Sequence, residues 1–430
     1  MKNFVKNSFV RFTLLGCALA LSIMVALISV KDSTFLLTLL SHQGQDSFLA
    51  ASRGAYSTHH RTTKTTTSVS VVTTSPTAPV APVVTSPTPS PSSNRYGVSV
   101  SAGLGTLSDQ EIKQELDDLV AMGVGWVRYD FGWDQIQAGG STSYDWVAPD
   151  RVVKAVLAHN LKILPLLTYT PAWARPSGCT TAFCGPANVA DFANFAKVVV
   201  ARYAPQGVHT WEIWNEPNVM QFWQPKPDPV AYTALLKAAY TAIKTQDQSA
   251  VVVSGGLAPA VTTSDKSLSP TDFVTGMYAQ GAQSNFDALG FHPYSYPAMP
   301  SNTSSWNAWA QMSVTAINIR GIMTANNDAG KQIWMTEFGS PTGGPGAIAT
   351  QSEPNFINMP DHVDEALQAA LLGDAGSLFR QYSWAGPLFL YSYKDLGVSP
   401  VTNENFFGLL RYDGSQKPVY SVLKQLTAAQ

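Results

Sequence analysis

The chain has 430 residues, and 27 Lys and Arg residues against 29 Asp and Glu residues give it a formal net charge of −2. This balance lacks the basic excess that nucleic-acid binding requires, so no nucleic-acid partner is expected. Hydrophobic residues make up 45% of the chain, which excludes a wholly disordered protein and supplies a large core.

Residues 1–31 have the pattern of an export signal. A charge-free run over residues 12–30 follows three basic residues, Lys2, Lys6 and Arg11. The run is close to the length that spans a bilayer as a helix, and no clear small-x-small cleavage motif closes it. An uncleaved signal anchor with a cytoplasmic N-terminus is therefore favoured over a cleaved signal peptide. Lipidation at Cys17 is the weaker alternative, because almost no apolar segment precedes it.

Residues 32–95 are expected to be a low-complexity linker. Within residues 62–93, 23 of 32 residues are Ser, Thr or Pro and none is acidic, so little apolar surface is available to drive folding. The prolines favour an extended stalk on the order of 100 Å, at ~3 Å per residue. Signal and stalk together predict an extracellular or cell-surface protein, either secreted or attached to the membrane through the N-terminal segment.

From residue 96 onward, predicted strands alternate with predicted helices eight times. The strands are expected at residues 96–101, 126–131, 162–170, 209–214, 251–255, 288–294, 332–337 and 387–393. Several helices have recognisable starts, such as the capping box of Ser108 and Glu111 and the Asp-Pro and Ser-Pro pairs at 228–229 and 269–270. Single helices are expected around residues 309–323, 361–381 and 418–426.

Eight such strand–helix units predict a (β/α)8 TIM barrel over residues 96–430. The strands are apolar throughout, as is typical of parallel strands buried on both faces. An open doubly wound α/β sheet is the alternative. It would require a glycine-rich phosphate turn after an early strand, and the Gly-Leu-Gly sequence at 103–105 lacks the third glycine.

Two glutamates stand where the chemistry of such a barrel lies, at the C-terminal ends of strands. Glu216 follows the fourth strand in the sequence Trp-Asn-Glu-Pro, and Glu337 ends the seventh strand in the sequence Thr-Glu-Phe-Gly. Strands four and seven can face each other across an eight-strand ring. Two facing carboxyl groups suit glycosidic cleavage, in which one protonates the leaving oxygen and the other attacks or activates water.

The motifs around these glutamates resemble those of glycoside hydrolase clan A, and more closely those of glycoside hydrolase family 39 and related bacterial exopolysaccharide hydrolases. The matching segments are residues 127–133, 170–174, 211–223, 291–294 and 407–410. The resemblance covers residues 96–426. It implies a retaining O-glycoside hydrolase that cleaves a polysaccharide or oligosaccharide by double displacement, with a glycan as substrate and no metal or cofactor. A monomer is expected.

The resemblance also assigns roles to the two glutamates. Glu337 would attack the anomeric carbon, and Glu216 would protonate the leaving group and then serve as base for the incoming water. This mechanism needs the two carboxyl groups ~5 Å apart. The negative charge of Glu337 should then raise the pKa of Glu216 and keep it protonated.

Four residues are expected to support this pair. Arg128 resembles the clan's strand-two arginine, which would keep Glu337 ionised through a charge-assisted hydrogen bond. Asn215 would bind the sugar 2-hydroxyl, Tyr294 would donate to Glu337, and His292 would line the same wall. Two structural alternatives remain. Arg128 could lie on the surface, and His292 could be a core residue whose hydrogen bonds are all made within the protein.

Aromatic side chains near the strand ends are candidate sugar platforms. Trp133, Trp173 and Trp223 could stack on sugar faces, although core packing is a close alternative for each. Tyr391, at the end of the eighth strand, is a further candidate for substrate binding or support. Glu212, Trp214 and Glu216 alternate along the fourth strand, so they are expected to share one side of it, with Glu212 in a structural role.

Cys179 and Cys184 lie close together in the loop after the third strand. In an exported chain a disulfide between them is expected, and two unpaired thiols are the alternative. The seven histidines have no metal-ligand spacing, so no metal site is predicted.

Two other classes of function remain open. A barrel that binds glycan at the surface without cleaving it would lack one of the carboxyl groups, and both are present. A metal-dependent or serine hydrolase would carry a His-Glu-x-x-His or Gly-x-Ser-x-Gly motif, and the sequence has neither. The glycan, its linkage and endo or exo action are not readable from the sequence, although residues 340–361 predict a long loop over the cleft.

Overall fold

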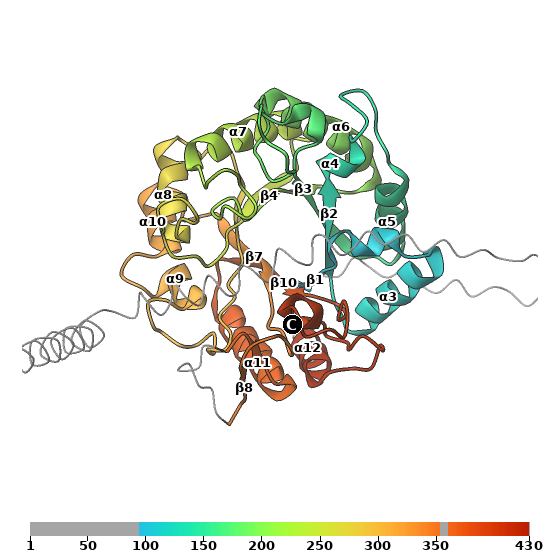
Figure 1. The fold of residues 1–430 in the computed structure, drawn as a ribbon, viewed down its shortest axis with the longest axis vertical. Coiled ribbons are helices and arrows are strands. Elements are labelled where there is room, and N and C mark those ends of the chain that lie inside the picture. Colours follow the sequence, from blue (N-terminus) through green and yellow to red (C-terminus); the bar gives the residue numbers. More distant parts are fainter. Residues whose placement is uncertain (1–93, 353–359, 430) are drawn as a thin grey trace, which may run out of the picture. The chain divides into compact units, whose positions relative to one another are not determined.

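The computed structural model describes residues 94–352 and 360–429, and its centre is a closed barrel of eight parallel strands (Figure 1). The strand order is β1-β10-β7-β6-β5-β4-β3-β2. Their bounds are β1 (Tyr96–Ser99), β2 (Trp126–Gly132), β3 (Lys162–Thr168), β4 (Thr210–Asn215), β5 (Val251–Gly256), β6 (Ala288–Phe291), β7 (Gln332–Phe338) and β10 (Ala385–Tyr391). The predicted TIM barrel is confirmed. The predicted signal segment and most of the linker lie outside the described residues.

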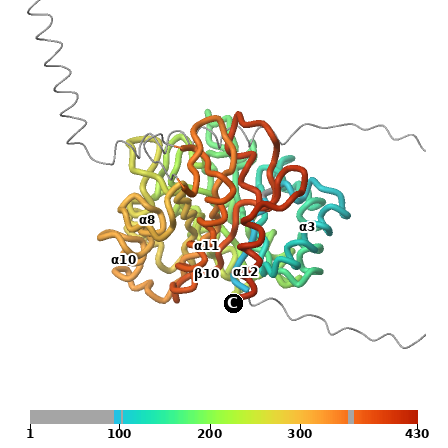
Figure 2. Tube along the Cα trace, turned by 90° about the horizontal axis from the view of Figure 1, so that it is seen from below, coloured from blue at the N-terminus to red at the C-terminus, as the bar shows by residue number. Residues whose placement is uncertain are grey.

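Helices surround the barrel and cover the outward faces of its strands (Figure 1). They are α3 (Asp109–Ala121), α4 (Trp133–Ile136), α5 (Val147–Ala158), α6 (Val189–Tyr203), α7 (Pro229–Gln246), α8 (Pro270–Ala279), α9 (Ala308–Ser313), α10 (Ile319–Ala325), α11 (Glu365–Gln381) and α12 (Pro418–Ala428). The last two, α11 and α12, pack together beside β10 (Figure 2). Within the described ranges, no helix combines the length and apolar character needed to cross a membrane.

The local signals for helix starts are confirmed where side chains cap the backbone. Ser108 and Glu111 form the predicted capping box of α3, and Asp228 accepts hydrogen bonds from the first free N–H groups of α7. The prediction of one helix over residues 309–323 is wrong. The chain forms α9 and α10 instead, because the Asn318 side chain accepts a hydrogen bond from the Gly321 N–H and starts a new helix.

The barrel interior is layered along its axis. Its N-terminal end is filled by apolar side chains from six strands, namely Trp126, Leu164, Val253, Ala288, Trp334 and Phe389. Trp126 and Trp334 come from strands that are not neighbours, yet their ring centroids lie 5.4 Å apart, so these rings meet inside the barrel. This plug excludes water beneath the charged residues that follow along the same strands.

The loop expected at residues 340–361 is partly structured. Two short strands, β8 (Ile348–Ala349) and β9 (His362–Val363), pair in parallel, and the Gly346 N–H donates to the Asp361 carboxylate. The Thr342 N–H donates to the carbonyl of Phe406, which ties this segment to the loop after β10. Residues 353–359 lie outside the described part of the chain.

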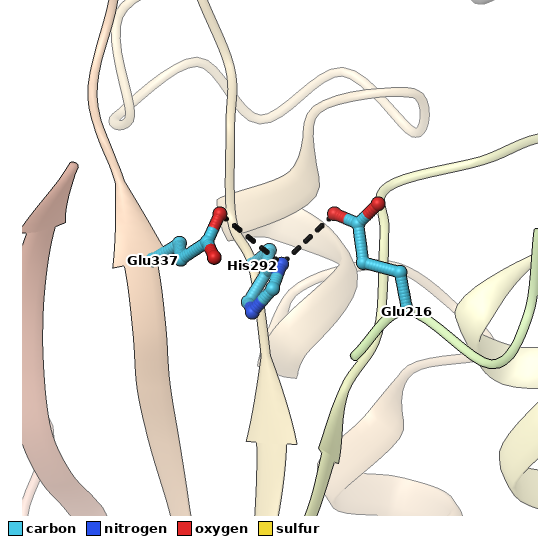
Figure 3. Close-up of side chains that lie close together, drawn as sticks. All are labelled: Glu216, His292 and Glu337. Atoms are coloured by element: carbon cyan, nitrogen blue, oxygen red, sulfur yellow. Dashed lines mark hydrogen bonds and ion pairs between the residues drawn. The ribbon is translucent and has the colours of Figure 1, made fainter. Parts of the chain in front are cut away.

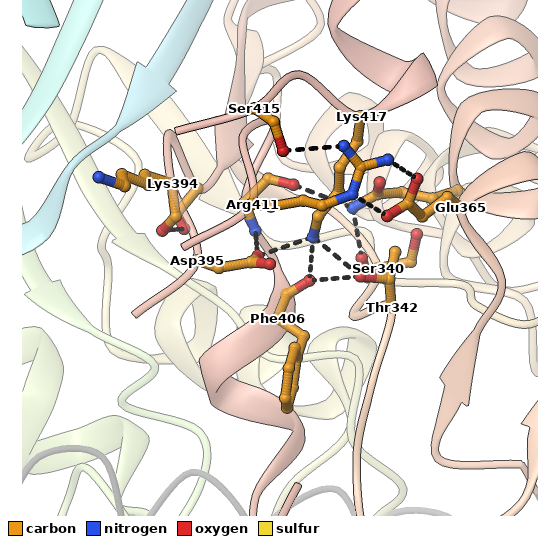
Figure 4. A network of polar contacts seen from close by, with 12 residues as sticks. Ser340, Thr342, Glu365, Lys394, Asp395, Phe406, Arg411, Ser415 and Lys417 are labelled. Atoms are coloured by element: carbon orange, nitrogen blue, oxygen red, sulfur yellow. Dashed lines mark hydrogen bonds and ion pairs between the residues drawn. The ribbon is translucent and has the colours of Figure 1, made fainter. Parts of the chain in front are cut away.

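A buried lysine fixes the loops that follow β7 and β10 (Figure 4). Lys417, just before α12, donates to Asp395 at 2.7 Å, to the Thr342 hydroxyl at 2.8 Å and to the Phe406 carbonyl at 2.9 Å. The Gly408 N–H also donates to Asp395. Burial lowers the pKa of Lys417 and raises that of Asp395, so each group depends on the other for its charge.

We predict that Lys417→Met lowers the free energy of unfolding by about 3–5 kcal/mol, because Asp395 would stay buried without its cation. Urea unfolding followed by tryptophan fluorescence measures the change. Lys424→Met, on the exposed face of α12, is the matched control and should stay within about 0.5 kcal/mol of the wild type. Equal effects of the two substitutions would show that the buried pair contributes nothing to stability.

Candidate active site

The carboxyl groups of Glu216 and Glu337 face each other across the mouth of the barrel, with the imidazole of His292 between them (Figure 3). Glu337 lies in β7, and Glu216 follows the last residue of β4. One oxygen from each carboxyl group and a ring nitrogen of His292 all lie within 4.8 Å of one another. The two residues are only 8% and 7% exposed, so their charges interact in a poorly solvated pocket.

Left-handed backbone geometry brings Glu216 to this position. Trp214 has a φ of 72° and Glu216 a φ of 43°, which bulky residues rarely adopt and which interrupts the alternation of side chains along β4. Glu212 and Asn215 consequently both reach Arg128. Trp214 packs on Phe192 of α6 instead. The expectation that Glu212, Trp214 and Glu216 share one side of the strand is therefore wrong for Trp214.

Arg128 is the centre of the polar layer above the apolar plug. Its Nε donates to Glu212 at 2.6 Å, its Nη1 donates to Glu337 at 2.6 Å, and its Nη2 donates to the Asn215 side-chain oxygen at 3.1 Å. The guanidinium is 1% exposed. Arg128 is therefore buried and fully engaged, which removes the surface-arginine alternative. Its contact with Glu337 is the one that the clan resemblance implies.

His292 connects the other glutamate to the barrel wall. Its Nδ1 lies 2.9 Å from Glu216 and 3.6 Å from Glu337, and its Nε2 lies 3.1 Å from the Thr336 hydroxyl. Burial lowers the pKa of His292, which favours a neutral ring. A neutral ring with the proton on Nδ1 donates to Glu216 and accepts from Thr336, so both contacts are satisfied.

Gly256, at the end of β5, makes room for this ring. A Cβ atom at this position would lie 2.1 Å from His292 Nε2 and 2.5 Å from the Thr336 hydroxyl oxygen, well inside contact distance. The Gly256 N–H also donates to Glu212 at 3.1 Å. The glycine therefore allows the close approach of His292, and its backbone helps to hold the partner of Arg128.

The environments of the two glutamates differ. Burial, together with the charge of Glu337, raises the pKa of Glu216, although the contact with His292 opposes this shift. Burial also raises the pKa of Glu337, but the Arg128 guanidinium and a 2.8 Å hydrogen bond from Tyr294 favour its ionised form. Two carboxyl groups this close do not both ionise readily, and the donors on Glu337 favour the negative charge there and the proton on Glu216.

The predicted aromatic platforms differ in their access to the mouth. Trp133 is fully buried against Phe192 and Phe195, which corrects the sugar-stacking prediction for this residue. Trp223 is nearly buried and lines a pocket of about 280 Å³ beside α6 and α7 whose lining includes neither glutamate. Trp173 is partly exposed, and its indole N–H donates to the Gln137 carbonyl. Of the three, Trp173 alone is not buried.

The sequence reasoning missed Glu404, in the loop after β10. The hydroxyl of Tyr391 donates to Glu404, whose other oxygen is buried with no hydrogen-bond partner among the described residues. Burial raises the pKa of Glu404 to about 8, despite the opposing hydrogen bond from Tyr391. Tyr391 is the only residue of β10 with partial exposure, so Glu404 holds the ring that faces the mouth. The sequence signal that could have identified Glu404 is its position, three residues before the segment 407–410 that resembles the clan A motifs.

Cys179 and Cys184 form the predicted disulfide in the loop after β3. The loop is held to the barrel because the Thr170 hydroxyl donates to the Cys184 carbonyl. It also contacts the segment after β4, where Thr181 donates to the Gln224 side chain. The disulfide therefore lies within the set of loops at the C-terminal ends of β3 and β4.

Glu216, His292 and Glu337 are also close enough together to hold a metal ion. Their lone pairs are largely engaged, because Arg128 and Tyr294 bind opposite oxygens of Glu337 and His292 contacts Glu216. Arg128 already supplies the positive charge that a cation would contribute. The contacts fit one ionised and one protonated carboxyl group better than a dedicated metal site.

The barrel, with two facing carboxyl groups at its C-terminal end, has the architecture of a clan A glycoside hydrolase. The family model described as cellulase (glycosyl hydrolase family 5) matches residues 87–361, and the chain belongs to this family. The predicted clan is confirmed.

Known proteins with similar sequence or fold include members of family 39. Over 116 residues the chain is 31% identical to a β-xylosidase of Geobacillus stearothermophilus. This match covers 24% of this chain and only 23% of that relative. A family 39 glycoside hydrolase from Bacteroides cellulosilyticus shares the fold with a TM-score of 0.59 and 23% identity, over 78% of this chain and 63% of that one. A monomeric β-xylosidase from Caulobacter crescentus gives a TM-score of 0.57 and 20% identity, over 78% and 68% of the two chains.

We predict that Gly256→Ala displaces His292 and lowers glycosidase activity by about 10²-fold, because small misplacements at a reacting centre have effects of this size. Steady-state hydrolysis of aryl glycosides measures the loss, and a crystal structure of the variant locates the ring. Gly330→Ala is the control, since a Cβ atom there meets no atom within 4 Å. A fully active Gly256→Ala variant would contradict the importance of the close approach.

Proposed function

We propose that this glycoside hydrolase cleaves an O-glycosidic bond of a polysaccharide or oligosaccharide with retention of configuration, using Glu337 as nucleophile and Glu216 as general acid and base. The proposal is carried by one observation, the approach of the two carboxyl groups to within 4.8 Å across the mouth. Retaining enzymes need carboxyl groups about 5 Å apart, whereas inverting enzymes need about 6.5–9.5 Å to admit a water molecule.

In the first step Glu337 attacks the anomeric carbon while the bond to the leaving oxygen breaks. Arg128 and Tyr294 each hold one oxygen of the Glu337 carboxylate, which keeps it ionised and fixes its direction. Glu216 donates its proton to the leaving oxygen. The products of this step are a glycosyl ester of Glu337 and a carboxylate at Glu216.

In the second step water attacks the glycosyl ester and restores Glu337. Esterification removes the negative charge of Glu337, so the pKa of Glu216 falls and its carboxylate accepts a proton from the water. His292 remains hydrogen-bonded to Glu216 and holds it in place through both steps. Asn215, oriented by Arg128, is positioned to bind the sugar 2-hydroxyl.

The names of the relatives suggest which substrates to test first. The matching family is named for cellulose cleavage, and the relative with 31% identity is a β-xylosidase. Aryl β-xylosides, xylan and cellulose are therefore the first substrates to test. The N-terminal signal and stalk predicted from the sequence support a location outside the cytoplasm, where such polymers are met. A barrel that binds glycan without cleaving it is the alternative function.

We predict that Glu216→Gln lowers kcat by about 10²–10⁴-fold and that Glu337→Gln lowers it at least as much, because each substitution removes a group that reacts directly. Hydrolysis of aryl glycosides is the assay, and thermal unfolding verifies that the variants fold. Glu365→Gln, which changes a surface ion pair with Arg411, is the matched control and should stay active. Wild-type turnover in both site variants would overturn the assignment.

Azide separates the two roles. With Glu337→Ala, azide should replace the missing nucleophile and give a glycosyl azide of inverted configuration. With Glu216→Ala, azide should attack the glycosyl ester and give the azide with retained configuration. NMR of the products distinguishes the two anomers, and the opposite pairing of variants and products would exchange the two roles.

The pH profile of kcat/KM should be bell-shaped. Activity rises with pH as Glu337 ionises, and it falls as pH passes through the raised pKa of Glu216, because the protonated form is the acid. Substitution of Glu216 by Gln should remove the alkaline limb with a 2,4-dinitrophenyl glycoside, whose leaving group needs no protonation. Persistence of that limb would assign it to a different group.

A further inference from the structure

Asp130 is a carboxylate at the mouth that the proposed mechanism does not use. It is the only residue of β2 with partial exposure. The pairing of β2 with β3 is regular from Trp126 to Gly132, so side chains alternate without interruption along this strand. Asp130 therefore points to the same side as Arg128, two residues closer to the open end of the barrel.

Among the described residues, no side chain or backbone group donates a hydrogen bond to Asp130. Arg128 attracts it electrostatically but directs its hydrogen bonds to Glu212, Glu337 and Asn215. Burial raises the pKa of Asp130 to about 6, as expected for a carboxyl group that is poorly solvated and lies near other carboxylates.

We propose that Asp130 determines which sugar is cleaved: it accepts hydrogen bonds from the ring that Glu337 attacks and rejects rings that carry a carboxylate. This inference rests on the proposed function and names its substrate class, neutral or amino sugars rather than uronic acids. A partly buried carboxylate without a donor is unfavourable until a ligand supplies one. Hydroxyl and ammonium groups are such donors, and a carboxylate is not.

Asp130 lies close enough to Glu337 for their charges to interact. Two residues along a strand span roughly 7 Å, so the backbone of Asp130 lies about the width of one sugar ring closer to the mouth than the backbone of Arg128. Arg128 is engaged with carboxylates, and Arg175 donates to the backbone carbonyls of Thr170 and Thr180. Neither arginine is available to neutralise an acidic sugar, so a uronic acid would face Asp130 uncompensated.

Asp130→Asn tests the proposal, because it removes the charge and keeps the shape. The substrates are the neutral 4-nitrophenyl glycoside that the wild type cleaves fastest, the uronide of the same ring configuration and the corresponding 2-amino-2-deoxy glycoside. We expect kcat/KM for the neutral glycoside to fall 10–100-fold and the uronide-to-neutral ratio to rise at least 10-fold. If Asp130→Asn loses more kcat/KM with the amino glycoside than with the neutral glycoside, the donor to Asp130 is the ammonium group. Equal losses with the two substrates identify hydroxyl donors.

Asp191→Asn is the control, because it removes the same charge at the partly exposed start of α6, outside the strands of the barrel. Its uronide-to-neutral ratio should stay within about 3-fold of the wild type. Two outcomes overturn the role of Asp130 alone: an active Asp130→Asn enzyme with unchanged selectivity, and a wild type that prefers the uronide. Failure of the wild type to cleave any glycoside would instead contradict the proposed function, and the inference that rests on it would fall too.

Discussion

A single guanidinium organises the charged interior of this barrel. Arg128 lies directly above an apolar plug, away from water, and its charge is tolerable only because Glu212 and Glu337 face it at hydrogen-bond distance. The same group orients Asn215. Removal of Arg128 would leave two buried carboxyl groups without their cation. The candidate nucleophile is therefore also part of the core, and its position is fixed by the requirements of folding.

The two facing glutamates are chemically identical, but their surroundings differ. Glu337 receives donors from a cation and a phenol, whereas Glu216 receives a contact from an imidazole that burial keeps neutral. The difference in local charge decides where the shared proton resides. In the proposed mechanism it also lets Glu216 change from acid to base, because the charge of Glu337 disappears when Glu337 becomes an ester.

The barrel, its strands and both glutamates could be predicted from the sequence, because apolar periodicity and strand-end position are local signals. Contacts that depend on irregular backbone geometry could not be predicted from the sequence. The left-handed turn at Trp214 breaks the alternation from which its orientation was predicted, and the complete burial of Trp133 depends on helices distant in sequence. Glu404 was missed for the same reason. Its partner Tyr391 lies on a strand, and only the folded loop brings the two together.

Closure of the barrel joins residues from opposite ends of the described chain. Tyr96 of β1 pairs with Leu388 of β10, 292 residues later, and Lys417 then secures the loop that holds Glu404. Contacts of such long sequence separation form late, because the intervening chain must first be brought together. During synthesis the site therefore cannot assemble step by step. The chain acquires its facing glutamates only when almost all of it is present, so an unfinished copy carries no competent pocket.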